Sequence, residues 1–385
     1  MSGLARTDTS LVGRWWWTVD RWALGALLVL AGIGIVLVLA ASPAVAERAG
    51  LDGYHFARRQ GVFLILGLVA MVAISLMSPR GVRRVALLML GASVVGMGLT
   101  LLIGAEVNGA QRWIRIFGLS LQPSEFLKPA FAVTSAWMLA QAHYREQFPG
   151  RTMALGLLVL MASLLLLQPD LGQTLVLCGI WAMQVFVAGL PIWIMGLLAF
   201  AGIGLVVGAY FTLGHVRSRI DTFLDPGEMG YQAKRSAEAF SHGGMFGTGP
   251  GEGSVKTVLP DAHTDFIFAV AGEEFGLIFC LAIVGLFAFV VLRGFSRLYR
   301  DQDLFVLLAG TGILTQIAAQ TFINMASAVH LIPPKGMTLP FISYGGSSTL
   351  ALGIGLGMLL AFTRERPRVE TGWARKPVWS GGGVP

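Results

Sequence analysis

Long apolar runs separated by short polar connections extend along most of this 385-residue chain. Ten of the runs approach the roughly 17 to 25 residues that an α-helix needs to cross a lipid bilayer. The pattern therefore predicts an all-α polytopic membrane protein with ten transmembrane helices. The ten runs are Trp22–Ala41, Val62–Met77, Val85–Ile103, Phe126–Ala142, Met153–Leu167, Leu171–Val187, Ile192–Leu213, Phe266–Leu292, Leu304–Phe322 and Ser347–Phe362.

The fifth and sixth runs are short, and only Gln168-Pro169-Asp170 separates them. They could form one broken helix or two helices joined by a turn. Proline lacks the amide proton that a helix interior needs and clashes with the preceding turn. We therefore expect a tight turn at Pro169.

Composition supports a membrane protein and gives no sign of a nucleic-acid-binding domain. Hydrophobic residues make up 55% of the chain and charged residues 13%, about half the charged share of a soluble protein. The net charge of +7 is spread over many short connections, whereas nucleic-acid-binding domains gather basic residues on one surface. Anionic lipid headgroups explain the charge, and we expect packing roles for Cys178 and Cys280, which lie inside apolar runs.

Arginine is concentrated in the N-terminal segment, in alternate connections and in the C-terminal tail. Because basic residues mark the cytoplasmic side, we expect both termini in the cytoplasm. The first run is longer than the apolar core of a signal peptide, so we expect an uncleaved helix although Ala44-Val45-Ala46 resembles a cleavage site. Trp15, Trp16, Trp17 and Trp22 flank this run, where indole rings favour the headgroup level.

These boundaries predict a cytoplasmic segment at residues 1–21, a membrane domain at 22–366 and a disordered cytoplasmic tail at 367–385. The connection at about 214–262 is far longer than the others and falls on the outer side. Loops of this length are usually functional or disordered, and we expect a mobile re-entrant or lid segment. Its glycines are not followed by Gly-Lys-Ser or Gly-Lys-Thr, so a nucleotide site is not indicated.

Four polar segments fall on the same outer side of the predicted helices. Ionisable residues at a membrane boundary are costly and mark candidate functional sites, and a segment rich in proline and glycine must line protein or water rather than lipid. The four segments are Asn108–Ile114 together with Gln122–Lys128, Gln168–Asp170, His263–Asp265 and Ile332–Ser348.

These segments resemble motifs of the SEDS family (shape, elongation, division and sporulation). The matching strings are Asn-Gly-Ala-Gln-Arg-Trp-Ile, Gln-Pro-Ser-Glu, Gln-Pro-Asp-Leu-Gly, His-Thr-Asp-Phe-Ile-Phe-Ala-Val and Pro-Phe-Ile-Ser-Tyr-Gly-Gly-Ser-Ser, in the family's order. The resemblance runs from about Trp22 to about Arg366. Lys335–Pro340 is closer to the division branch of the family than to its elongation branch.

The resemblance implies a peptidoglycan glycosyltransferase of the bacterial inner membrane. Such an enzyme polymerises lipid II on the periplasmic side, at the division septum, beside a class B penicillin-binding protein (FtsI-like) and other division proteins. Asp265 matches the family's catalytic aspartate and would be the general base. Without that match, Thr264 or Asp265 could simply cap the helix that follows.

The remaining polar residues at this side are candidate substrate contacts. Glu125 and Lys128 lie three positions apart, so they can form an ion pair that shapes a cavity. Arg112 and Lys335 could meet the pyrophosphate or remain solvated loop charges, and His263 could contact substrate or be structural. Adjacent Glu273 and Glu274 are expected in a buried polar network. The resemblance also implies substrate contacts at Trp113, Thr264, Ser343 and Tyr344.

A divalent cation, magnesium or manganese, is expected only because the substrate carries a pyrophosphate; the sequence shows no ligand cluster.

Two other functions compete with the enzyme. A lipid II flippase would place polar groups throughout the membrane, whereas here they gather at the outer side. A scaffold for the penicillin-binding protein would give Asp265 no reason to occupy a costly position.

Overall fold

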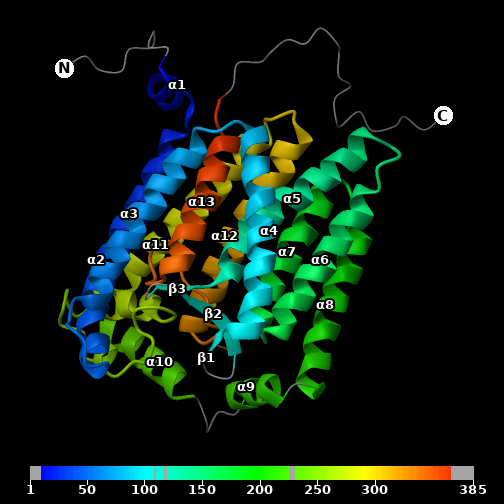
Figure 1. Ribbon diagram of the computed structural model, residues 1–385. Coiled ribbons are helices and arrows are strands. Elements are labelled where there is room, and N and C mark those ends of the chain that lie inside the picture. The colour runs from blue at the N-terminus through cyan, green and yellow to red at the C-terminus, as the bar shows by residue number, and fades with distance from the viewer. Residues whose placement is uncertain are drawn as a thin grey trace.

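The computed structural model describes residues 10–107, 110–116, 119–212, 214–224, 230–333 and 335–365. Most of its helices run side by side in one bundle (Figure 1). The helices are α1 (Leu11–Thr18), α2 (Arg21–Arg48), α3 (His55–Ser75), α4 (Pro79–Ile103), α5 (Pro123–Tyr144), α6 (Gly150–Leu167), α7 (Leu171–Val187), α8 (Ile192–Thr212), α9 (Gly214–Leu224), α10 (Tyr231–Gly243), the 3-10 turn η1 (Val255–Thr257), α11 (Ile267–Leu298), α12 (Leu304–Ala328) and α13 (Gly346–Phe362). The strands are β1 (Ala105–Val107), β2 (Ala110–Ile116) and β3 (Leu119–Leu121).

All ten apolar runs predicted from the sequence are helical, as α2 to α8 and α11 to α13. Six of these helices are long and apolar enough to cross a membrane by length and composition, namely α2, α3, α4, α6, α11 and α12. Large apolar side chains such as Ile65, Leu88 and Leu292 are exposed on the outside of the bundle. Exposure of such side chains is expected where lipid, rather than water, surrounds the helices.

Short polar residues and prolines fix where several helices begin. Asp20, Ser78 and Asp303 occupy N-cap positions and accept hydrogen bonds from amides of the first turn of α2, α4 and α12. Such caps satisfy amides that have no carbonyl partner within the helix. Helix α5 begins at Pro123, which has no amide proton to satisfy.

The break at Pro169 is confirmed, because α6 and α7 are separate helices joined by Gln168-Pro169-Asp170. A second break was not predicted. Gly276 interrupts α11 with φ 81° and ψ 179°, a conformation that glycine adopts far more readily than other residues. The amides of Leu277 and Ile278 therefore bond to the carbonyl groups of Gly244 and Met245 in a neighbouring loop.

Helices α3 and α13 pack backbone against backbone. A Cβ atom at Gly353 would overlap the Gly67 carbonyl, and one at Gly357 would overlap the Met71 carbonyl. Small residues permit this close approach, which replaces the hydrophobic driving force that is missing between helices in lipid. The contact connects the end of α13 that carries the Ser343–Gly346 segment to α3.

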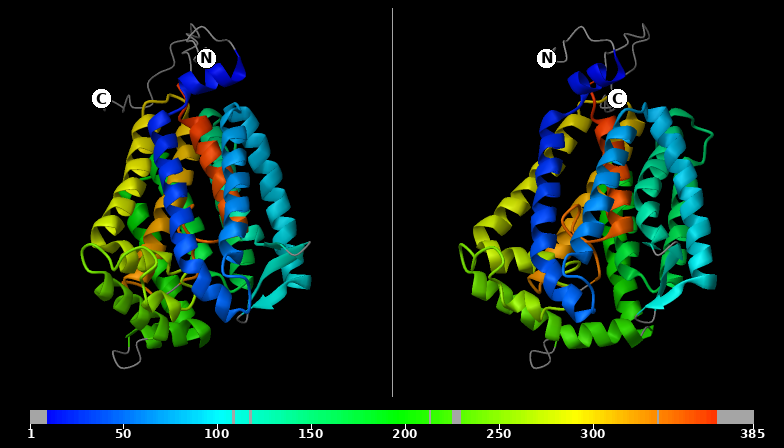
Figure 2. Two further views of the ribbon diagram at one scale, coloured as in Figure 1. Left: turned by 90° about the vertical axis from the view of Figure 1, so that its left-hand side faces the viewer. Right: turned by 60° about the vertical axis from the view of Figure 1, so that its left-hand side comes forward.

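The two ends of the described chain meet at one end of the bundle. The amide of Glu365 donates to the Thr18 carbonyl, and Arg364 donates to the Thr18 hydroxyl. The strands, α9 and α10 lie at the opposite end (Figures 1 and 2). This arrangement agrees with both termini on one side, whereas residues 1–9 and the predicted tail at 367–385 lie outside the described residues.

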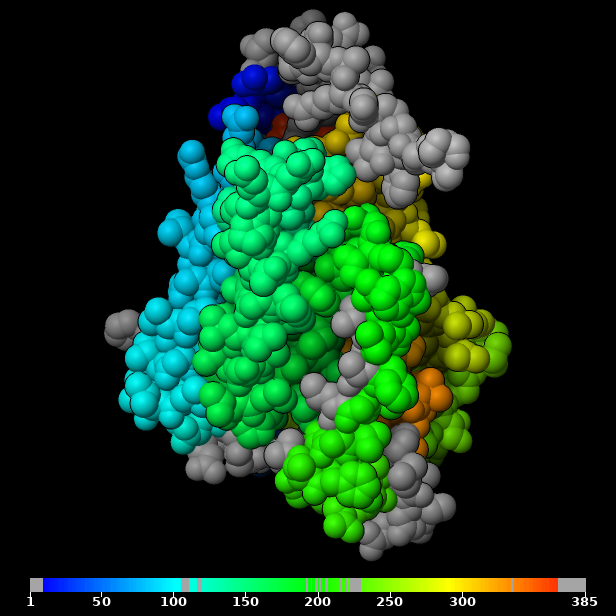
Figure 3. All heavy atoms as spheres, turned by 90° about the vertical axis from the view of Figure 1, so that its right-hand side faces the viewer, coloured from blue at the N-terminus to red at the C-terminus, as the bar shows by residue number. Residues whose placement is uncertain are grey.

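The outer connections contain secondary structure that was not predicted. The long connection, for which a re-entrant or lid segment is expected, contains α9, α10 and η1, and α10 buries one face that includes Ala233, Ser236 and Ala239. The outer loop around Arg112 forms strand β2 of a three-stranded antiparallel sheet in the order β1-β2-β3. On the side of the bundle that lies at the right in Figure 1, α6 and α8 are at the surface (Figure 3).

Candidate functional site

Asp265 lies in the loop before α11 rather than in the helix. The helix begins at Ile267, and its N-cap residue is Phe266, which makes no side-chain capping bond. The alternative in which Thr264 or Asp265 caps this helix is therefore wrong. The half-buried Asp265 carboxylate faces Gly336, because a Cβ atom added there would lie 3.7 Å from its Oδ2.

Asn324 of α12 holds the backbone on both sides of this carboxylate. Its Nδ2 atom donates to the carbonyl oxygens of Asp265, at 2.9 Å, and of Met337, at 2.7 Å. The side chain is buried, so water competes little for these bonds. Asn324 thus ties the catalytic candidate to the segment that carries Lys335 and Gly336.

Ser343 and Gln60 fix the other side of the same loop. The Ser343 hydroxyl donates to the Thr264 carbonyl at 2.6 Å and accepts from the Leu339 amide at 2.8 Å. The buried Gln60 side chain of α3 donates to the Ser343 carbonyl, and its Oε1 accepts from the Gly345 amide. The predicted contacts Thr264 and Ser343 therefore join each other and form part of the frame around Asp265.

His263 packs in an aromatic group beside this frame. Its ring centroid lies 4.5 Å from that of Phe56 and 5.2 Å from that of Tyr344, and its carbonyl accepts from the Tyr344 amide. Burial, with a smaller contribution from the Arg48 guanidinium, lowers the pKa of His263 to about 4. The imidazole is therefore neutral at neutral pH.

A second polar group runs from α5 to the sheet. Lys128 Nζ donates to Glu125 Oε2 at 2.9 Å, and Gln173 Nε2 donates to Glu125 Oε1 at 2.7 Å. The Gln173 amide bonds to Asp170, which pairs with Arg112 at 3.2 Å. The predicted pair of Glu125 and Lys128 is thus the buried end of a longer chain of contacts.

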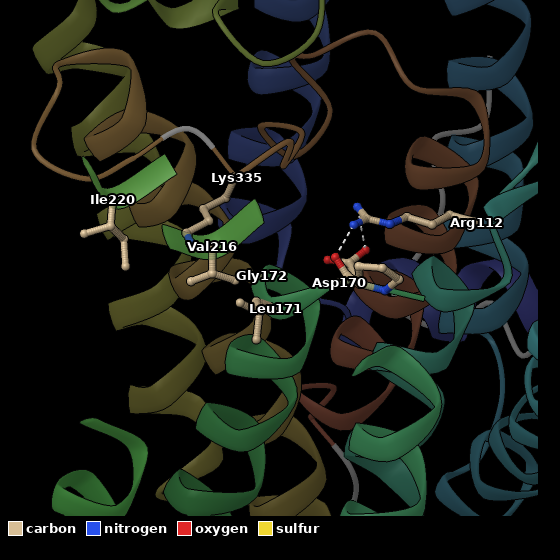
Figure 4. Close-up of a pocket in the computed structure, with 8 residues that line it drawn as sticks. Arg112, Asp170, Leu171, Gly172, Val216, Ile220 and Lys335 are labelled. Carbon is tan, nitrogen blue, oxygen red and sulfur yellow. Dashed lines mark hydrogen bonds and ion pairs between the residues drawn. The ribbon is translucent and has the colours of Figure 1, made fainter. Parts of the chain in front are cut away.

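The exposed end of this chain opens into a small pocket. Arg112 also donates to the carbonyl oxygens of Gln168 and Pro169, and its guanidinium points at Asp170 while Lys335 enters from another segment (Figure 4). Burial raises the pKa of Asp170, although the Arg112 charge opposes this. Besides Arg112, Asp170 and Lys335, the pocket is lined by Pro169, Leu171, Gly172, Val216 and Ile220.

The expected buried network at Glu273 and Glu274 is confirmed. The Glu273 carboxylate accepts from the amides of Val255 and Lys256, and Glu274 pairs with the Lys256 ammonium group. Both glutamates are buried, so these bonds compensate for the loss of water. They fasten the end of the long connection to α11, next to the break at Gly276.

Gln60 and Asn324 were not predicted as parts of the site, because each is a single polar residue inside an apolar helix. Asp170 belongs to the Gln-Pro-Asp segment that the sequence had marked as a candidate. Trp113 is half-buried on β2 beside Arg112. Across the described ranges, no group of three or more His, Cys, Asp or Glu side chains is placed to hold a metal ion.

The architecture and this site define a polytopic α-helical membrane protein with ionisable groups gathered at one end of its bundle. The family model for cell cycle proteins of the FtsW, RodA and SpoVE type matches residues 21–368, and the chain belongs to this family.

Relatives within the family support the division branch. The chain is 47% identical over 369 residues to a probable peptidoglycan glycosyltransferase FtsW of Caulobacter vibrioides, with 94% of each chain covered. It is 37% identical over 358 residues to another from Geobacter metallireducens, covering 89% of this chain and 94% of the relative. Both relatives carry the FtsW name.

Solved structures share the fold. A chain from a study titled structural coordination of polymerization and crosslinking by a peptidoglycan synthase complex matches with a TM-score of 0.71 and 28% identity. The rod shape determining protein RodA of Thermus thermophilus matches with a TM-score of 0.66 and 28% identity. Each match covers 90% of this chain and 97% of the other.

Proposed function

We propose that this protein is a peptidoglycan glycosyltransferase that polymerises lipid II in septal cell-wall synthesis, with Asp265 as the general base. The observation that carries the proposal is the placement of the Asp265 carboxylate. It faces Gly336, and the backbone around it is held by Asn324 and Ser343. A base must be held in this way if it is to meet a substrate hydroxyl in one geometry.

The reaction joins the 4-hydroxyl of the acceptor sugar to the anomeric carbon of the donor sugar. The new carbon–oxygen bond forms as the bond to lipid pyrophosphate breaks, and the hydroxyl proton passes to the Asp265 carboxylate. A neutral His263 beside this position can donate or accept a hydrogen bond without adding charge. His263 and Thr264 are therefore proposed substrate contacts.

Arg112 and Lys335 would stabilise the departing pyrophosphate. Both line the same pocket, and the Arg112 charge is balanced by Asp170 in the structure. A pyrophosphate carries more negative charge than one carboxylate, so it would compete for the guanidinium. Trp113 would border this region, while Glu125 and Lys128 would fix its inner wall through Gln173.

A divalent cation, magnesium or manganese, would accompany the substrate rather than occupy a protein cage. Magnesium retains several waters and commonly takes one or two carboxylates together with phosphate oxygens. The Asp265 carboxylate faces Gly336, the residue after Lys335. The cation would neutralise the pyrophosphate, and Asp265 would remain available as the base.

The proposed partner is a class B penicillin-binding protein of the FtsI type, together with other division proteins and lipid II itself. The study of the solved complex named above concerns the coordination of polymerisation and crosslinking. The described residues of this chain form the helical bundle and the short elements at its end, so we assign crosslinking to a separate partner. We further propose that the active site faces the periplasm at the septum. Reporter proteins inserted near Glu238 should behave as external, and those fused after Arg84 or Arg300 as cytoplasmic.

The decisive experiment incubates the purified protein, with and without its partner, with lipid II and magnesium, and separates the glycan products. Asp265→Asn preserves size but removes the base, so polymer should fall by about 10²- to 10⁴-fold. Asp261→Asn, four residues earlier in the same loop, is the matched control and should retain activity. Normal polymerisation by the Asp265→Asn protein would reject Asp265 as the base, and lipid II movement without polymer would favour the flippase.

A further inference from the structure

Helix α1 lies across the end of the bundle, whereas the ten long helices run along it (Figure 2). One side of α1 is attached to the protein, because Trp15 is buried and its Nε1 donates to the Ser75 hydroxyl at the end of α3 at 2.8 Å. The other attachment is at Thr18, which contacts Arg364 and Glu365. The orientation of α1 is therefore fixed by contacts from both sides of the bundle end.

Two apolar residues at the start of α1 are exposed. Leu11 is 72% exposed and Val12 is 57% exposed. Leu11 is four positions before Trp15, so the two side chains share one face of the helix. Trp15 faces the bundle, so Leu11 lies on the same side of α1, yet its side chain is not covered by the bundle.

Trp22 continues this apolar surface onto the first turn of α2, where it is 71% exposed. The Arg21 guanidinium lies over the rings of Trp16 and Trp17, at 6.0 and 5.3 Å from their centroids. Indole rings with an adjacent cation are typical of side chains at the headgroup level. The apolar side chains and the adjacent guanidinium group therefore match the acyl region and the headgroup region of a bilayer surface.

The end of the bundle that carries α1 has an excess of positive charge on its surface. Asp20 is buried and binds Arg293 and Arg297, which leaves it unable to neutralise other arginines. Arg14, Arg21, Arg80 and Arg84 are exposed at the same end, and none forms an ion pair with a carboxylate among the residues that the structure describes. Exposed guanidinium groups beside an apolar helix face complement anionic phosphate headgroups.

We propose that α1 is an in-plane membrane anchor that binds anionic phospholipid at this face of the bilayer. Leu11, Val12 and Trp22 enter the acyl boundary, and Arg14 and Arg21 meet phosphate groups. A partner protein would need a complementary acidic surface, but the continuity of Trp22 with the lipid-facing side of α2 favours lipid. The anchor holds the ends of α3 and α13, the two helices whose opposite ends carry Gln60 and the Ser343–Gly346 segment.

The test places a polarity-sensitive fluorophore at Leu11→Cys in the full-length protein, on a background with Cys178→Ala and Cys280→Ala. The protein is reconstituted in nanodiscs of phosphatidylcholine alone or of phosphatidylcholine with phosphatidylglycerol. Ser254→Cys, which is exposed at the opposite end of the bundle, is the matched control. Size-exclusion profiles establish that each labelled protein is folded.

The Leu11 fluorophore should be quenched by lipids labelled near the headgroup and protected from aqueous iodide, unlike the Ser254 control. Protection should increase with phosphatidylglycerol, and Arg14→Gln with Arg21→Gln should weaken that increase by up to about fivefold per arginine. Iodide quenching equal to that of the control would overturn the proposal. Equal protection in both lipids and in detergent would also overturn it, because the fluorophore would then be covered by protein.

Discussion

The side-chain amide of Asn324 donates one hydrogen bond to the Asp265 carbonyl and another to the Met337 carbonyl. The residue lies near the end of the apolar helix α12, and it joins the two segments that face each other across the proposed site. Together with the Ser343 bonds to Thr264 and Leu339, this link limits movement of the Asp265 carboxylate relative to the Lys335–Gly336 segment.

Replacement of Asn324 by Leu should therefore lower kcat for lipid II polymerisation by about 10²-fold, since small displacements of a base are costly. KM should change little, because Asn324 is proposed to position the base rather than to touch substrate. The measurement is a steady-state assay of glycan product with purified protein. Gln320→Leu, one turn earlier on α12, is the control, and equal losses in both variants would indicate a general packing defect.

Glu125 and Lys128 should govern folding as well as activity. Lys128 is fully buried, and its ammonium group lies 2.9 Å from Glu125 Oε2. Lys128→Met leaves a buried carboxylate without its partner, which costs about 3 to 5 kcal/mol. The yield of folded protein after purification should decrease sharply in Lys128→Met and in Glu125→Gln.

The double variant Glu125→Gln with Lys128→Met tests the cause of that decrease. It removes both charges, so it should recover much of the folded protein that each single change loses. Thermal unfolding in detergent provides the comparison. A double variant as unstable as the sum of the singles would mean that the two charges do not stabilise each other.

His263 should make stability depend on pH. Its pKa is about 4 in the folded protein, below the value of about 6.5 expected in an unfolded chain. The unfolded state therefore binds the proton first as pH falls, and the folded state loses up to about 3 kcal/mol between pH 6.5 and 4. Above pH 6.5 this contribution is fully present.

His263→Phe isolates this effect because it retains a ring against Phe56 and Tyr344. The difference in unfolding temperature between pH 7 and pH 5 should be smaller in the variant than in the parent protein. An unchanged difference would assign the pH dependence to other groups.

Polymerisation should require a divalent cation. Chelation with EDTA should abolish glycan product, and magnesium or manganese should restore it, because the departing pyrophosphate needs charge neutralisation. Thermal stability without substrate should be unaffected by EDTA, since the described residues contain no cluster of three or more metal-ligand side chains. Full activity after exhaustive chelation would leave Arg112 and Lys335 to neutralise the leaving group.

Depletion of the protein should stop division while cells continue to elongate, and a fluorescent fusion should concentrate at the septum. The basis is the similarity to relatives named FtsW and the division-like Lys335–Pro340 segment. Rounded cells that still divide would instead assign the protein to elongation, and the catalytic proposal for Asp265 would be unaffected.

The ten helices were predictable from the sequence alone, because the length of an apolar span is set by the thickness of the bilayer and does not depend on the neighbouring helices. The turn at Pro169 and the pairing of Glu125 with Lys128 were also predictable from the sequence, since each depends on residues within one turn. Asp265 was identified through the order of short motifs.

The surroundings of those residues were not predictable without the folded structure. Gln60 and Asn324 have no local pattern that separates them from other polar residues in apolar helices, and their partners are 283 and 59 positions away. The break at Gly276 depends on the loop that supplies carbonyl groups to α11. Helix α10 of the long connection depends on packing against α11. Such contacts join distant segments, so their free energy is defined by the assembled bundle and not by neighbours along the chain.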